Sequence, residues 1–130
     1  MEAGVKPESI DFQVLSRLGG ERREYRAGEI IFRAGESANE FFVVREGTVA
    51  VEVNGAIIER LGSSEIFGEM ALVEAKPRSA TVVAETDCAV VPISEKQFLA
   101  MVEYAPSFSL AVIRTLAHRL RQANAHRRAA

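Results

Sequence analysis

The sequence lacks several features that secreted, membrane-spanning and disulfide-rich proteins share. It contains no tryptophan. It contains one cysteine, Cys88, so no disulfide can form within the chain. Its first residues lack the basic and apolar segments of a secretory signal, and its longest uncharged apolar stretch, residues 88–93, is much shorter than a membrane span. These absences predict a cytoplasmic protein, and 130 residues, 48% of them hydrophobic, are enough for one hydrophobic core.

Acidic residues are missing from the C-terminal part of the sequence. None follows Glu103, so residues 104–130 carry a charge of +5 and residues 1–103 a charge of −7. The net charge is only −2, which gives no indication of nucleic-acid binding. We interpret the basic tail as the polar face of a helix rather than as a phosphate-binding surface. Its arginines are Arg114, Arg119, Arg121, Arg127 and Arg128.

Short β-branched or aromatic runs separated by glycine-bearing turns fill residues 24–93, which is typical of an antiparallel sandwich or barrel. The sequence Asn54-Gly55 predicts a type I′ turn and therefore a hairpin, since both residues tolerate positive φ. The predicted strands cover residues 30–32, 41–45, 49–53, 57–61, 80–84 and 88–93.

The pattern becomes helical after Ile93. Ser94 and Gln97 fit a capping box, which predicts a helix to about Tyr104, and Pro106 suits the first turn of a second helix that runs to about Asn124. We expect an apolar stripe of this second helix to pack on the strands or on a second copy of itself. The stripe consists of Leu110, Ile113, Ala117 and Leu120. Residues 10–18 could form a further short helix, and the whole of residues 1–130 is predicted to be one domain.

Residues 67–82 interrupt the strand pattern with groups suited to a small anion. Gly68 lets the backbone approach a ligand closely, and residues 69–72 favour a single helical turn that exposes N–H donors. Arg78 would bring a fixed positive charge to the same anion, and Ser79 would add a hydroxyl donor. Glu69 would repel a phosphate, but its carboxylate could accept a hydrogen bond from a sugar hydroxyl. Together these groups indicate a nucleotide held by its phosphate and its ribose.

Two motifs in this segment resemble the phosphate-binding cassette of the cyclic-nucleotide-binding domain family, which includes the domains of the catabolite activator protein, kinase regulatory subunits and cyclic-nucleotide-gated channels. They are F-G-E-M-A-L, residues 67–72, and P-R-S-A-T-V, residues 77–82. Further similarity covers residues 27–124, about three quarters of the chain. The resemblance implies a mainly β fold: an antiparallel, jelly-roll-like β-roll over about residues 24–93, with the cassette on one side and C-terminal lid helices over about residues 94–124.

The same resemblance implies a role for individual residues. Gly68 and the amides after it would bind the cyclic phosphate together with Arg78 and Ser79. Glu69 would bind the ribose 2′-hydroxyl. The remaining members of the implied site are Phe67, Met70 and Ala71 of the cassette, Val51 and Ile58 near the purine, and Asn124 at the end of the lid helix. Val51, Ile58 and Met70 can also be read as ordinary core residues.

Enzymes of similar outline are less consistent with the sequence. A metal-dependent cupin needs several inward-facing histidines, but the two histidines, His118 and His126, both lie in the tail. No serine or cysteine lies in a recognisable nucleophile motif. We therefore expect a protein that is not an enzyme and has no cofactor or metal.

The predicted function is that of a stand-alone receptor module that binds cAMP, and cGMP as well, and signals through movement of the lid helix. Its output would pass to an unidentified effector protein or to an oligomer, including a homodimer through the C-terminal helix. Only six residues follow Asn124, too few for a DNA-binding module. The alternative is a ligand-binding domain cut from a cyclic-nucleotide-regulated channel or transcription regulator.

Overall fold

The computed structural model describes residue 17, residues 20–74 and residues 76–129, with side chains described up to residue 122. The short helix predicted over residues 10–18 falls outside the described residues except at one position. Within the described residues, eight strands form two antiparallel sheets, in the orders β1-β8-β3-β6 and β2-β7-β4-β5. The strands are β1 (Arg23–Tyr25), β2 (Ile30–Phe32), β3 (Glu40–Glu46), β4 (Val49–Val53), β5 (Ala56–Leu61), β6 (Ile66–Phe67), β7 (Thr81–Ala84) and β8 (Cys88–Ser94).

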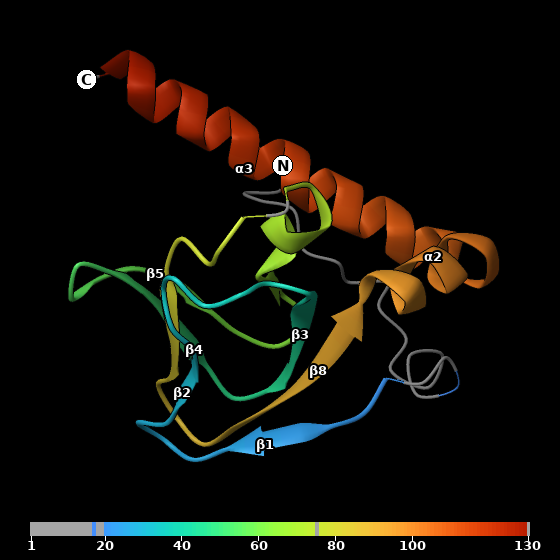
Figure 1. Ribbon diagram of the computed structural model, residues 1–130, viewed down its shortest axis with the longest axis horizontal. Helices are drawn as coiled ribbons and strands as arrows, with labels where there is room; N and C mark the ends of the chain where they lie inside the picture. Colours follow the sequence, from blue (N-terminus) through green and yellow to red (C-terminus); the bar gives the residue numbers. More distant parts are fainter. Residues whose placement is uncertain (1–16, 18–19, 75, 130) are drawn as a thin grey trace.

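The two sheets enclose a core of aliphatic and aromatic side chains, which confirms the predicted antiparallel β-roll (Figure 1). Phe42 of β3 and Phe67 of β6 stack with ring centroids 4.9 Å apart, and Phe32 of β2 packs against both. Because alternate residues of a strand point to opposite faces, one face of each sheet supplies this core. Phe67, the first residue of the predicted cassette, is thus itself part of the core.

The predicted turn between β4 and β5 is present. Asn54 has φ 52° and Gly55 has φ 81°, the signs that a type I′ turn requires. Val53 pairs with Ala56 across the hairpin. The turn thus determines the register of the two strands that form one wall of the site described below.

Two helices follow β8, as predicted. Helix α2 (Glu95–Tyr104) begins with a complete capping box between Ser94 and Gln97, and helix α3 (Pro106–Ala129) begins at the predicted proline. A second core cluster joins them to the roll through Phe41, Met101 and Val112, among others. Figure 1 shows α3 running along one side of the roll, above the short 3-10 helix η1 (Glu69–Leu72). In the described part of the chain, no helix combines the length and hydrophobicity needed to cross a membrane.

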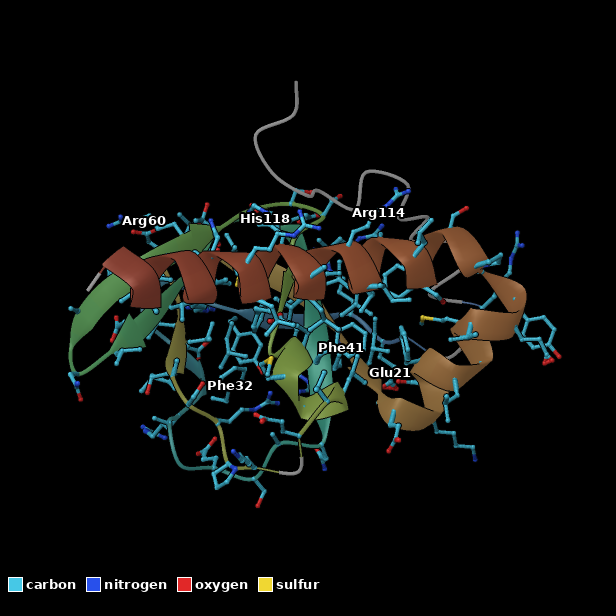
Figure 2. The ribbon with its side chains drawn as sticks, turned by 90° about the horizontal axis from the view of Figure 1, so that it is seen from above. Glu21, Phe32, Phe41, Arg60, Arg114 and His118 are labelled. Atoms are coloured by element: carbon cyan, nitrogen blue, oxygen red, sulfur yellow. The ribbon has the colours of Figure 1, made fainter. Side chains whose placement is uncertain are left out.

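Of the two predicted partners of the stripe that includes Leu110, Ile113 and Leu120, the roll is not the one that it packs on, and packing on a second copy stays a prediction. Those three side chains are exposed, and the face that packs on the roll contains Phe108 and Val112. The two stripes have similar spacing, so the larger Phe108 and its neighbours compete successfully for the core. In Figure 2, Arg114 and His118 lie on one side of α3, and Phe32 and Phe41 of the roll lie on the other.

Candidate ligand-binding site

The predicted cassette forms one wall of a cavity of about 240 Å³, and the β4–β5 hairpin and α3 contribute to its other walls. The structure brings together eight of the ten residues that the sequence suggested for the site. They are Val51, Phe67, Gly68, Glu69, Met70, Ala71, Arg78 and Ser79. Their placement around one cavity is consistent with a shared ligand, although their individual contacts with a ligand stay predictions.

Gly68 is required at its position for two reasons. It caps the N-terminus of η1 with φ 74°, in the left-handed region that side chains disfavour. A Cβ atom built on it would lie 2.8 Å from Nη1 of Arg78. Both the turn into η1 and the close approach of Arg78 to the backbone therefore depend on the absence of a side chain here.

Arg78 lines the cavity and is 9% exposed. Its Nη1 donates to the Gly68 carbonyl oxygen at 3.1 Å, and its Nη2 donates to the Glu40 carbonyl oxygen at 2.7 Å. The guanidinium carbon lies 4.0 Å from the ring centroid of Phe32. Backbone carbonyls and an aromatic face orient the group without neutralising it, because none of these partners carries a negative charge.

The charge of Arg78 is incompletely matched. Burial lowers the pKa of its guanidinium, while the more distant carboxylates of Glu40, Glu36 and Glu69 oppose that shift. Its Nε is buried and has no hydrogen-bond partner among the described residues. A buried donor without an acceptor is costly, so this arrangement favours an anion that can accept from Arg78.

Glu69 is 3% exposed, and both of its carboxylate oxygens accept hydrogen bonds from Nη1 of Arg119, at 2.9 and 2.8 Å. Nη2 of Arg119 also donates to the Ile66 carbonyl oxygen at 2.8 Å. An ionised carboxylate has about four lone-pair positions, so Glu69 can accept a further hydrogen bond, such as one from a sugar hydroxyl.

Arg119 lines the cavity but is not among the residues that the sequence predicts for the site. The sequence predicts that the arginines of the tail form the polar face of a helix, but the Arg119 side chain is only 25% exposed and lines the cavity. It is one of the positions 108, 112, 115 and 119, which share one face of a helix. The spacing from Phe108 and Val112 puts Arg119 on their face of the helix, and the structure shows that this face is the buried one.

Two predicted site residues are not placed in the cavity. Ile58 is 63% exposed and does not line it. A bulge lies between the Val51–Glu59 and Glu52–Ile57 pairs and leaves Ile58 without a partner in β4. The bulge places Glu59 on the cavity wall in its stead. The side chain of Asn124 lies outside the described residues.

The described residues offer no cluster of three or more histidine, cysteine, aspartate or glutamate side chains that could hold a metal ion. Cys88 is buried, and burial raises the pKa of its thiol. A raised pKa keeps the thiol protonated near neutral pH, which opposes its use as a nucleophile.

Comparison with known proteins identifies the fold and the kind of site. Residues 22–104 match the family model described as "Cyclic nucleotide-binding domain". The Cyclic AMP receptor protein of Thermus thermophilus is 32% identical over 126 residues, which cover 93% of this chain and 57% of that protein. The Pycsar effector protein XpPycTIR of Xanthomonas perforans is 34% identical over 106 residues, which cover 81% of this chain and 35% of that protein.

Among solved structures, the catabolite activator protein of Thermus thermophilus superposes with a TM-score of 0.76 at 29% sequence identity. The match covers 90% of this chain and 58% of that one. The chain thus spans about a third of the Xanthomonas relative and somewhat more than half of the Thermus relative.

Proposed function

Because this chain belongs to the cyclic nucleotide-binding domain family, we propose that it is a receptor module that binds cAMP, and cGMP as well, without turning either over. The family model describes a nucleotide-binding domain, and the match covers only 35% of the Xanthomonas relative. Binding would convert the presence of a small cyclic phosphodiester into a change at α3. The downstream effector would then read that change.

The observation that carries this proposal is the state of Arg78. Its guanidinium is buried, oriented by two carbonyl oxygens and left with an Nε that has no partner among the described residues. A cyclic phosphate would supply a negative charge and acceptor oxygens at that point. Glu69 lies on the same cavity and retains acceptor capacity for the ribose 2′-hydroxyl. Phosphate and ribose would thus each meet a group of matching polarity.

Isothermal titration calorimetry with cAMP, cGMP, AMP and ATP tests this function directly. We expect saturable heats for the two cyclic nucleotides and much weaker heats for AMP and ATP, whose open phosphates are larger and more highly charged. The absence of cyclic-nucleotide binding at high micromolar concentration would refute the proposal. Analysis of the nucleotides after incubation should find them unchanged.

The output would use α3, which joins the cavity to the outer surface. Arg119 links this helix to Glu69 on one face, while Leu110, Ile113 and Leu120 are exposed on another. Their spacing continues through Ala117 as steps of three and four, the pattern of a helix that pairs with a second copy. A nucleotide that donates a hydrogen bond to Glu69 would change how this carboxylate holds Arg119 and therefore α3. Hydrogen exchange across residues 106–124, with and without cAMP, should show a change in protection if α3 carries the signal.

The receptor module either acts by itself, which is the first arrangement, or is the ligand-binding part of a larger protein, which is the second. The second is supported by the share of the relatives that the chain covers, 35% and 57% in the two described above. The mass of the full gene product distinguishes the two arrangements. The site and its ligand would be the same in both.

A further inference from the structure

Besides Glu69, two carboxylate residues line the cavity: Glu74, which follows η1, and Glu59, which lies on the β4–β5 hairpin. Glu59 of β5 pairs directly with Val51 of β4, and both residues line the cavity. The bulge at Ile58 gives Glu59 this direction, because the extra residue shifts the alternation of the strand by one. The residue predicted near the purine, Ile58, is apolar and does not line the cavity.

Glu59 and Glu69 differ in how many hydrogen bonds their carboxylates already accept from the protein. Glu69 is buried and accepts two hydrogen bonds from Arg119. The Glu59 side chain is 43% exposed, and its Oε2 lies 3.9 Å from Nη2 of Arg119, which is longer than a hydrogen bond. Among the described residues, no donor forms a hydrogen bond with Glu59. Its carboxylate is therefore free to accept from a bound molecule.

Glu59 and Glu69 approach the same guanidinium from different parts of the cavity wall. One guanidinium, that of Arg119, contacts Glu69 with Nη1 and approaches Glu59 with Nη2. Glu59 and Glu69 are therefore neighbours on the cavity, Glu69 in the cassette and Glu59 on the β4–β5 hairpin. If the phosphate binds at Arg78 and the ribose at Glu69, the base extends toward Val51 and Glu59.

We propose that Glu59 reads the base and makes the site prefer cGMP over cAMP; this inference rests on the proposed function. An ionised carboxylate accepts hydrogen bonds and donates none. Guanine presents two adjacent donors, N1–H and the 2-amino group, which match the two carboxylate oxygens. Adenine presents one donor, its 6-amino group, beside the acceptor N1, whose lone pair repels the carboxylate. Glu59 thus distinguishes the purines by the number of adjacent N–H groups that they offer.

The test compares cGMP, cAMP and cyclic IMP in calorimetric titrations of the parent chain and of Glu59→Gln. Hypoxanthine has the N1–H of guanine but lacks the 2-amino group, so cyclic IMP should bind between the other two. The exposure of Glu59 limits each step to about fivefold in dissociation constant. Glu59→Gln should weaken cGMP binding by about fivefold and leave cAMP binding equal or stronger, because an amide can accept from the 6-amino group while donating to N1 of adenine.

Glu52→Gln is the matched control. Glu52 lies on the same hairpin, opposite Ile57, and does not line the cavity, so its replacement should leave the ratio of the two affinities unchanged. If Glu59→Gln changes the affinities for cGMP and cAMP in parallel, Glu59 does not read the base, while the receptor function stands. If the parent chain binds neither nucleotide, the proposed function and this inference both fail.

Discussion

The cassette and helix α3 each bring one arginine to the same cavity, and the two arginines are held in opposite ways. Arg78 of the cassette is bound by backbone carbonyls of Gly68 and Glu40 and by an aromatic ring, with no ion pair among the described residues. Arg119 of α3 is bound by both oxygens of Glu69. The first guanidinium is oriented but not neutralised, and the second is neutralised by the protein itself.

We therefore expect the two arginines to have different roles: Arg78 binds the ligand, and Arg119 joins α3 to the roll. A buried positive charge without a counter-ion lowers stability unless an anion arrives, so Arg78 is suited to hold the ligand. A charge already paired with a carboxylate adds little attraction for an anion, but it joins the helix to the roll. Substitutions at the two positions should therefore affect different measurements.

The largest expected effect is that of Arg78→Ala on nucleotide binding. It should raise the dissociation constant for cAMP by about 30- to 1000-fold, equivalent to roughly 2–4 kcal/mol, because the phosphate loses a desolvated charged partner. Arg78→Lys should restore only part of this, since an ammonium cannot supply two parallel donors. Calorimetry measures both, with the exposed Arg114→Ala as the control. If Arg78→Ala binds cAMP as tightly as the parent chain, the phosphate does not bind at Arg78.

The next effect is that of Arg119→Ala on folding stability. Removing the guanidinium leaves the carboxylate of Glu69, which is 3% exposed, without its ion pair. We expect the free energy of unfolding to fall by about 1–3 kcal/mol, below the range for fully buried pairs because Arg119 is itself partly exposed. Urea denaturation measures the change, and Arg114→Ala on the other face of α3 should stay within about 0.5 kcal/mol of the parent.

A double-mutant cycle completes that experiment. Glu69→Gln removes the negative charge, so adding it to Arg119→Ala should recover part of the lost stability. Purely additive effects of the two substitutions would mean that the contact between Arg119 and Glu69 contributes nothing to folding.

The parts of the fold that could be predicted are those with local causes. The turn at Asn54 and Gly55 and the capping box at Ser94 and Gln97 are present as expected, because each depends on a few neighbouring residues. Strands β1 and β6 were not predicted. They have only three and two residues and are defined by pairing with β8 and β3, which are distant in the sequence.

The same distinction applies to the candidate site. Gly68, Glu69 and Arg78 could be found because one contiguous segment contains them. Arg119 could not be paired with Glu69 from the sequence, since fifty residues separate them and the pairing depends on which face of α3 is buried. The bulge that exchanges Ile58 for Glu59 is likewise visible only once β4 and β5 are aligned.

The smallest effect is expected on the outer face of α3, where Ile113 lies next in sequence to the buried Val112. Val112 is 0% exposed, within the cluster that includes Phe41 and Met101, whereas Ile113 is 56% exposed. Val112→Ala should lower the free energy of unfolding by about 1–2 kcal/mol through lost burial and a cavity. Ile113→Ala should change it by less than about 0.5 kcal/mol in dilute protein.

If α3 pairs with a second copy, Ile113→Ala should also lower the midpoint of unfolding at high protein concentration, because dimerisation stabilises the folded state by mass action. Urea denaturation at two concentrations, with sedimentation velocity, measures both effects. Equal destabilisation by the two substitutions at every concentration would show that the wrong face of α3 has been assigned to the roll.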